Sequence, residues 1–393
     1  MRILLVTRIF PSGQNPTDAP YNRQLYAALS RHCEVTVCCL HATFPGRSLV
    51  KPTSSVPTGR ETIAGLEVHH RRVVYAPRWG RPLSGPLYVA SLLPWALAWR
   101  GRVDLVVGSF AYPDGFAASA LGRILGVPAA IQVLGSDINV FSVDPLLRPH
   151  IAWSLRHAQA VFGPSHALID QCVALGAAPA RCLMLPNGID REVFRPRERA
   201  LARRALGEVE EGEWIVQVGR LEPAKGVWDT LAAFERLRER RPGLKLVLVG
   251  HGVDRDAIER RAVERALPVL LPGVRDDVGM WMAAADVVTL PSFREGTPNA
   301  VLEALASGRR VVASNVGGIP DAMSDPVLGE MVSPGDPEAL ELALERVLDA
   351  PGDPETIVER ARIPSWEHCA QILWDHLLGC GALPVPRGTA PAA

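Results

Sequence analysis

The chain has 393 residues, of which 48% are hydrophobic, and this size suits two domains with separate cores. Lys plus Arg and Asp plus Glu number 42 each, so the balanced charge gives no general case for nucleic-acid binding. The seven cysteines form no CxxC pair and no ligand spacing with histidine, and their odd number argues against a disulfide framework, so we expect no zinc site and a reducing compartment.

The first residues predict a buried strand. The apolar run in MRILLVTRIF is short and has no small-residue cleavage site after it. This pattern favours a strand over a signal peptide, and we therefore expect a cytoplasmic protein. Charge is nevertheless unevenly distributed along the chain. Residues 1–190 contain 17 basic and 10 acidic side chains, and the remainder is correspondingly acidic. The front half would therefore suit an anionic partner.

Short apolar runs alternate with helical stretches through the front half, as in a doubly wound α/β domain. A polar loop with Gly13 follows the first run and offers a position for close backbone approach to a ligand. The expected parallel strands are Ile3–Thr7, Glu34–Cys39, Leu105–Gly108, Ala129–Val133 and Ala160–Gly163.

The segment Pro82–Trp99 carries no charge over 18 residues. Its prolines and its position before a strand favour a crossover helix facing the core. A helix that lies in the membrane surface is the alternative, with Trp95 and Trp99 dipping into the bilayer. The basic residues that would support it are Arg78, Arg81, Arg100 and Arg102.

Asp137 lies in the polar turn that follows the strand Ala129–Val133. Its carboxylate is a candidate acid or base, and an Asx-turn cap explains it equally well. The Arg-rich stretch Phe194–Gly212 then leads into a second series of strands and a second Rossmann-like domain. The expected strands are Trp214–Val218, Lys245–Val249, Val269–Leu271, Val287–Leu290 and Val311–Ala313.

The loop after the first strand of this second series reads Val218-Gly-Arg-Leu-Glu-Pro-Ala-Lys-Gly226. Arg220 and Lys225 place two cations at the carboxyl end of a parallel sheet, where doubly wound folds bind ligands. Such cations neutralise a diphosphate leaving group without a metal ion. Gly250 closes the next strand in a similar turn.

The stretch from Leu290 to Gly308 carries the most specific signal in the chain. A Glu-Gly-Thr-Pro-Asn run, Glu295 to Asn299, links a strand to a helix. With Pro298 at the first helical position, the N–H groups from Thr297 to Ala300 would be free to bind phosphate. Glu303 lies one turn into that helix, where its carboxylate can accept two hydrogen bonds from a diol such as ribose.

These motifs together resemble the retaining GT-B glycosyltransferases of family 4, in a branch active in bacterial polysaccharide synthesis. The resemblance covers residues 1 to about 375 and rests on GSDIN, LPNGID, VGRLEPAKG, VGHG, LPG, SFREGTPNAVLEALASG and NVGGIPD. Where many relatives have Gly-Gly in the first loop and His before the Gly-x-Asp turn, this chain has Ser12-Gly13 and Leu134. The resemblance therefore does not predict the identity of the donor sugar.

The resemblance implies two Rossmann-like doubly wound domains that face each other across a cleft. Residues 1–192 would bind the acceptor, 193–364 would bind the nucleotide sugar, a helix at about 365–380 would return to the first domain, and 381–393 would be a disordered tail. Arg220 and Lys225 would grip the diphosphate, Glu303 the ribose and Glu295 the sugar. The full donor set would be Gly13, Arg220, Lys225, Gly250, Val274, Glu295, Gly296, Thr297, Pro298, Asn299 and Glu303.

The implied activity is hexosyl transfer from a UDP- or GDP-sugar, which is a substrate rather than a cofactor, in cell-surface polysaccharide or glycolipid synthesis. We expect no cofactor or catalytic metal. The expected acceptor is a glycan or lipid-linked sugar, with peripheral contact to the anionic inner face of the cytoplasmic membrane and no nucleic-acid partner. A nucleotide-sugar 2-epimerase on the same fold and a non-enzymatic sugar-nucleotide binding protein are the alternatives.

Overall fold

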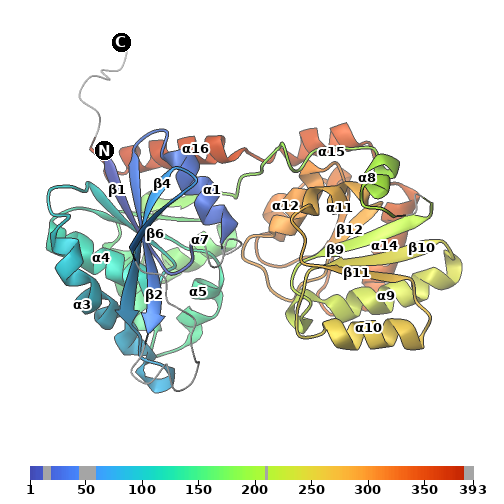
Figure 1. Cartoon of the computed structure of the whole chain (residues 1–393), viewed down its shortest axis with the longest axis horizontal. Coiled ribbons are helices and arrows are strands. Elements are labelled where there is room, and N and C mark those ends of the chain that lie inside the picture. Colours follow the sequence, from blue (N-terminus) through green and yellow to red (C-terminus); the bar gives the residue numbers. More distant parts are fainter. Residues whose placement is uncertain (12–18, 44–58, 209–210, 385–393) are drawn as a thin grey trace, which may run out of the picture. The chain divides into compact units, whose positions relative to one another are not determined.

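The structure is a computed structural model that describes residues 1–11, 19–43, 59–208 and 211–384. The chain divides into two compact units (Figure 1). The first consists of Met1–Gly188 together with Trp366–Ala393, and the second is Ile189–Ser365. Both are layers of helices around a largely parallel sheet, so the expected α/β architecture of two Rossmann-like domains is confirmed.

The first unit has an eight-stranded sheet in the order β3-β4-β2-β1-β5-β6-β7-β8. All neighbours pair in parallel except the hairpin of β3 and β4, and all five expected strands are present. β3 and β4 were not predicted because charged residues and histidines interrupt any apolar run in them, and β8 was not predicted because it has only three residues. The strands are β1 Arg2–Thr7, β2 Glu34–Thr43, β3 Gly59–Ile63, β4 Leu66–Val74, β5 Leu105–Ser109, β6 Ala129–Gln132, β7 Ala160–Gly163 and β8 Cys182–Met184.

Alternating side chains of β1 face two separate cores. Ile3 and Leu5 pack with α1 and α16, whereas Leu4 and Val6 pack with α3 and α4. Because β1 is central, apolar residues on both of its faces are buried. The helices of this unit are α1 Pro20–Leu29, α3 Ser84–Leu97, α4 Asp114–Leu125, α5 Ser136–Asn139, α6 Arg148–His157, α7 His166–Ala174 and α16 Trp366–Gly379.

The uncharged segment forms a core helix, α3, preceded by the 3₁₀ helix η1, Arg78–Leu83. Tyr88, Leu92 and Ala96 are buried against the sheet. The tryptophans that we considered as membrane anchors are half-buried and pack against this core, and the rings of Trp95 and Trp99 both lie 5.6 Å from that of His69. This packing favours the core-facing helix, and the membrane-surface alternative stays a prediction for these two side chains. No helix in the described part of the chain is long and apolar enough to span a bilayer.

The chain beyond α16 is partly ordered, contrary to our expectation of a disordered tail from residue 381. Ala382 and Leu383 are buried in the core formed by β1, α1 and α16. The N–H groups of both residues donate to Leu377 O, which folds the chain back onto the helix. Two apolar side chains that reach a core outweigh the Gly- and Pro-rich composition around them. Residues 385–393 lie outside the described residues.

The second unit has a six-stranded parallel sheet in the order β11-β10-β9-β12-β13-β14. The strand order reverses between β9 and β12, which makes their carboxyl ends the expected ligand position. The strands are β9 Glu213–Val218, β10 Leu244–Val249, β11 Val269–Gly273, β12 Val287–Leu290, β13 Val311–Ser314 and β14 Gly329–Val332. The helices are α8 Arg199–Ala205, α9 Val227–Arg240, α10 Arg255–Glu264, α11 Val278–Ala284, α12 Asn299–Ala306, α13 Ile319–Ala322, α14 Pro337–Asp349 and α15 Pro354–Ala361.

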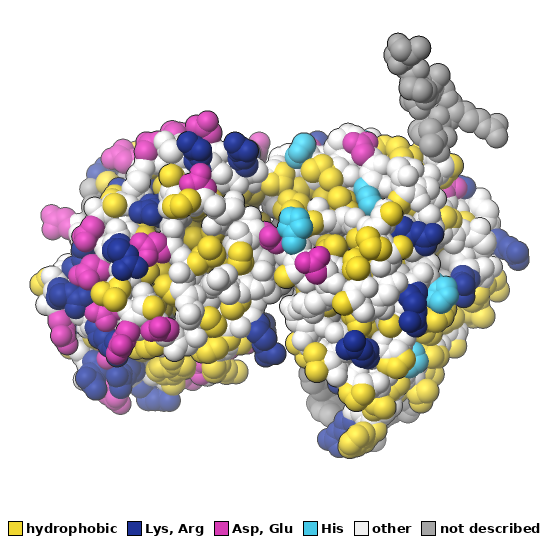
Figure 2. All heavy atoms as spheres, turned by 180° about the vertical axis from the view of Figure 1, so that it is seen from behind, with side chains coloured by type: hydrophobic (Ala, Val, Ile, Leu, Met, Phe, Trp, Pro, Cys, Tyr) yellow, Lys and Arg dark blue, Asp and Glu magenta, His cyan; other side chains and the backbone are white. Residues whose placement is uncertain are grey.

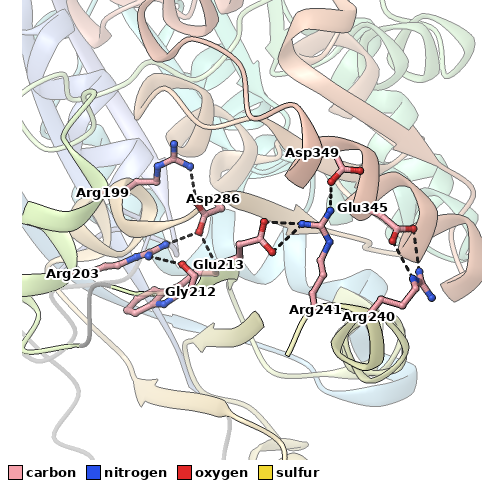
Figure 3. A network of polar contacts seen from close by, with 10 residues as sticks. Arg199, Arg203, Gly212, Glu213, Arg240, Arg241, Asp286, Glu345 and Asp349 are labelled. Atoms are coloured by element: carbon pink, nitrogen blue, oxygen red, sulfur yellow. Dashed lines mark hydrogen bonds and ion pairs between the residues drawn. The ribbon is translucent and has the colours of Figure 1, made fainter. Parts of the chain in front are cut away.

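Ion pairs fasten the opposite, amino edge of this sheet (Figure 3). Asp286, just before β12, accepts from Arg199 and Arg203 at 2.5 Å each and from the N–H of Trp214 at 2.7 Å. The Arg203 side chain is almost fully buried and also donates to the carbonyl oxygens of Gly212 and Ala284. These charges are fully engaged in holding β9, β12 and α8 together, so we assign them a structural role.

Candidate functional site

The strongest candidate site lies at the carboxyl ends of β9 and β12 in the second unit. Lys225, in the loop after β9, places its Nζ 2.7 Å from Oε1 of Glu295, in the loop after β12. The Ser292 hydroxyl donates to the same oxygen at 2.7 Å. The predicted cation and the predicted carboxylate therefore meet where the strand order reverses.

Close backbone approach holds the two loops together. Gly226 has φ 64° and follows Lys225, and a Cβ there would lie 2.1 Å from Pro291 O. The N–H of Phe293 donates to Ala224 O at 3.0 Å. Gly250 plays a similar part after β10, since a Cβ there would lie 1.9 Å from Gly219 O. Only glycine fits at these two positions.

The turn before α12 differs in detail from our expectation. Pro298 is the residue before the first helical position rather than that position itself, and the N–H of Asn299 donates to Thr297 O at 3.0 Å. Among the described residues, no acceptor contacts the N–H groups of Gly296, Thr297 and Ala300. These three groups at a helix start form a positive surface suited to an anion.

Glu303 lies on α12 and is half-buried. Burial raises the pKa of its carboxyl from 4.5 to about 7, and within the described ranges no donor contacts its oxygens. A desolvated carboxylate without a donor is unfavourable in the absence of a ligand. It can accept hydrogen bonds from a bound diol.

Two predicted donor residues lie away from this cluster. The Arg220 side chain is 73% exposed and pairs with Glu222 at 3.0 Å. Val274, which follows β11, is 71% exposed. Arg220 and Val274 do not contact Lys225 or Glu295 in this structure. Both nevertheless follow strands of the second sheet and lie at its carboxyl edge. Gly13 lies outside the described residues.

Asp137 has the geometry of a structural cap. Its buried carboxylate accepts from the N–H groups of Ala111, Leu134 and Gly135 at 2.8, 3.1 and 2.8 Å. Burial raises the pKa of this carboxyl, and the three N–H donors act in the opposite direction. Since its oxygens are occupied and inaccessible, the geometry favours the cap over the acid or base role.

The first unit contains a pair that we did not predict from the sequence. Arg8 follows β1 and Asp114 begins α4, at the point where the strand order of this sheet reverses between β1 and β5. The N–H of Arg8 donates to Asp114 at 3.0 Å, and its guanidinium lies 4.7 Å from the ring centroid of Phe110. Burial raises the pKa of the Asp114 carboxyl to about 7. The signal available in the sequence was that Arg8 directly follows a buried strand and that Asp114 lies in the short connection after another one.

Comparison with known proteins supports this assignment of fold and family. A family model for glycosyl transferase 4-like domains matches residues 19–188, and a model for group 1 glycosyl transferases matches residues 212–350. TuaC of Bacillus subtilis, named for teichuronic acid biosynthesis, is 28% identical over 348 residues, which cover 81% of this chain and 82% of TuaC. D-inositol 3-phosphate glycosyltransferase of Kribbella flavida is 34% identical over 213 residues, half the length of each chain.

Solved structures show the same fold at low identity. Sucrose-phosphate synthase from Thermosynechococcus elongatus aligns with a TM-score of 0.77 and 22% identity, and covers 97% of this chain and 99% of its own. Anabaena HepE in complex with UDP and glucose aligns with a TM-score of 0.72 and 18% identity, and covers 96% of this chain and 98% of its own. Two family models that span most of both units, together with these neighbours, show that the chain belongs to the family 4 type glycosyltransferases with the GT-B fold.

Proposed function

We propose that this protein transfers a hexosyl group from a nucleoside diphosphate sugar to an acceptor, with retention of configuration and without a metal ion. The Lys225–Glu295–Ser292 cluster beside the start of α12 carries this proposal. A cation, a carboxylate and unpartnered N–H groups lie together at the strand reversal. That combination suits a ligand with a diphosphate at one end and sugar hydroxyls at the other.

Each group has a role that follows from its chemistry. Lys225 and the N–H groups of Gly296, Thr297 and Ala300 would contact the diphosphate, Glu303 the ribose diol, and Glu295 the sugar hydroxyls. Arg220 would need to leave Glu222 and turn toward the phosphates. Because charge grows on the diphosphate as the sugar bond breaks, these donors stabilise the transition state more than the ground state.

The reaction needs no protein nucleophile in this proposal. The bond between the anomeric carbon and the diphosphate oxygen breaks, and the acceptor oxygen forms its bond on the same face. The acceptor proton passes to the departing phosphate oxygen. The relatives support this donor class, since HepE is described in complex with UDP-glucose and with UDP. TuaC supports a polysaccharide or glycolipid product at the cell surface.

The proposed acceptor is a lipid-linked glycan at an anionic membrane, which the first unit would contact through the surface around η1. Trp79 and Leu83 are 88% and 59% exposed there, and Arg78 and Arg81 flank Trp79. A cavity of about 530 Å³ is lined by Trp79, Arg81 and Leu146 with their neighbours. On the face of the first unit seen at right in Figure 2, apolar and basic side chains lie among neutral atoms and acidic side chains are few.

The structure separates the four arginines that we grouped as a membrane anchor. Arg78 and Arg81 follow β4, so they lie at the carboxyl edge of the sheet. Arg100 and Arg102 precede β5 and lie at the amino edge, where Arg2 donates to Gly101 O at 3.0 Å. A surface near η1 would therefore use the first pair alone. The second pair supplies a matched control.

Vesicle flotation tests the membrane proposal. Wild-type protein should bind vesicles rich in anionic lipid at low salt and dissociate at high salt, because each arginine near such a surface contributes about 1 kcal/mol. Trp79→Ser with Arg78→Ser and Arg81→Ser should lose binding, whereas Arg100→Ser with Arg102→Ser should retain it. Equal loss in both variants, or no binding by wild type, would refute a contact around η1.

A transfer assay tests the activity itself. Wild-type protein is incubated with UDP-, GDP- or ADP-sugars and a membrane lipid extract, and release of nucleoside diphosphate and labelling of lipid are measured. We expect lipid-dependent release with one base, and a product with the donor's anomeric configuration. Conversion of the nucleotide sugar without any acceptor would identify an epimerase instead, and an inverted product would contradict retention.

A further inference from the structure

Strand pairing in the first unit assembles a cluster of metal-ligating side chains. Cys39 and His41 are two residues apart on β2, so they point to the same face of the sheet. His70 on β4 is the register partner of Cys39 in the parallel pair. One ligand atom from each of these three residues lies within 4.8 Å of the other two. Cys39 and His70 are buried, and His41 is half-buried.

A carboxylate orients one of the two imidazoles. Glu61 on the edge strand β3 places its Oε1 2.5 Å from Nε2 of His70. A carboxylate only accepts hydrogen bonds, so Nε2 of His70 carries the hydrogen and its Nδ1 keeps a lone pair. This Nδ1 lies 2.8 Å from Nε2 of His41. Outer carboxylates hold the ligating histidines of metal sites in the same way.

The three donor atoms lie near enough to one another, within 4.8 Å, for one metal ion to be considered. With metal–nitrogen bonds of about 2.0–2.1 Å and metal–sulfur bonds of about 2.3 Å, donor atoms around zinc lie roughly 3.3–3.6 Å apart. The two imidazole nitrogens are slightly closer than this and share a hydrogen bond. Small rotations of the half-buried His41 would open the space for an ion.

We propose that Cys39, His41 and His70 bind a zinc-type divalent cation, with Glu61 as the carboxylate that orients His70. One thiolate and two imidazoles favour Zn²⁺ over Mg²⁺ or Ca²⁺, which prefer oxygen ligands. The spacing of cysteines led us to expect no zinc site, because the third ligand comes from a strand that the sequence pattern did not reveal. The ion would join β2 to β4 and stabilise the first unit.

The residues of this site belong to the first unit, whereas Lys225, Glu295 and Glu303 belong to the second. The proposed ion is structural, so the proposed transfer reaction does not use it. Metal binding at this cluster can be measured without any glycosyltransferase activity.

Cobalt titration of the chelator-treated full chain tests the site, because Co²⁺ bound to a thiolate gives a near-ultraviolet charge-transfer band. We expect one Co²⁺ per chain with this band, and displacement by Zn²⁺. His41→Gln and Cys39→Ser should bind at least 100-fold more weakly, and Glu61→Gln about 10–100-fold more weakly. Cys182→Ser and His157→Gln, on the same unit away from the cluster, should bind as wild type.

Circular dichroism checks that each variant is folded. His41→Gln decides the question if Cys39→Ser does not fold, because the His41 side chain is only half-buried. Absence of a one-to-one complex in wild type would overturn the proposal, and the three side chains would then form a hydrogen-bond cluster only. Persistence of the band in folded Cys39→Ser, or wild-type affinity in folded His41→Gln, would also overturn it.

Discussion

Replacing Glu303 by glutamine should stabilise the protein and weaken nucleotide binding at the same time. The substitution keeps the shape of a half-buried side chain on α12 and removes its charge. Within the described residues the carboxylate has no donor to compensate its burial, so ionisation is a cost to the folded state that a bound ribose would relieve. A residue whose burial serves only packing would not show both effects.

The size and pH window follow from the pKa of the Glu303 carboxyl, raised by burial from 4.5 to about 7. Between these values the folded state holds a proton that the unfolded state has released. Rising pH therefore lowers the unfolding free energy through this window, and the loss is complete above pH 7. The full shift corresponds to about 3 kcal/mol, and partial access of water reduces the expected effect to about 1–3 kcal/mol.

Thermal unfolding at pH 4 and pH 8 measures this difference. Glu303→Gln should have a higher midpoint than wild type at pH 8, by about 2–4 °C per kcal/mol, and the same midpoint at pH 4. Its affinity for nucleoside diphosphate should fall about 10–100-fold, because hydrogen bonds to a carboxylate contribute about 1.5–3 kcal/mol. Glu259→Gln, on the exposed face of α10, is the control. No stabilisation at pH 8 would refute the desolvation, and unchanged affinity would refute the ribose contact.

Four further perturbations test the site and the fold. Lys225→Ala should lower kcat about 100–1000-fold with a smaller change in KM. Arg220→Ala should lower kcat less, because the Arg220 side chain is exposed and paired with Glu222. Unchanged kcat in Lys225→Ala would contradict the role of Lys225 on the leaving group. Activity should persist in excess EDTA, and a loss that Mg²⁺ or Mn²⁺ restores would show a metal-dependent reaction. In denaturant titration, Leu383→Ala should lower the unfolding free energy by about 2–4 kcal/mol. Leu342→Ala, at an exposed position, is the control and should leave the unfolding free energy nearly unchanged. Equal stability of both variants would contradict the packing of residue 383.

The sequence predicted the sheet cores well because their strands are continuous apolar runs. All ten expected strands are present, and Ala160–Gly163 and Val287–Leu290 match to the residue. The hairpin of β3 and β4 was missed because its strands are at or near the sheet edge and carry charges and histidines. This omission also concealed the Cys39, His41 and His70 cluster, whose members are distant in sequence and meet only through strand pairing.

The sequence predicted which residues form the candidate donor site, but it did not predict the contacts between them. Motif spacing placed Lys225 and Glu295 at one sheet edge, and the structure adds their direct pairing and the part of Ser292. The pairing depends on the backbone approach of Gly226 to Pro291, which no local pattern reveals. For Asp137, two roles were equally compatible with the turn, and only its three N–H donors separate them.

Titration calorimetry of the wild-type chain with UDP, GDP and ADP tests the central claim most directly, because the claim requires a nucleoside diphosphate to bind the second unit. We predict one-to-one binding of one of the three, weakened in Lys225→Ala and Glu303→Gln and unchanged in Glu259→Gln. Failure of all three nucleotides to bind, or binding that is equally strong in all variants, would contradict the assignment of the Lys225–Glu295–Ser292 cluster as the donor site.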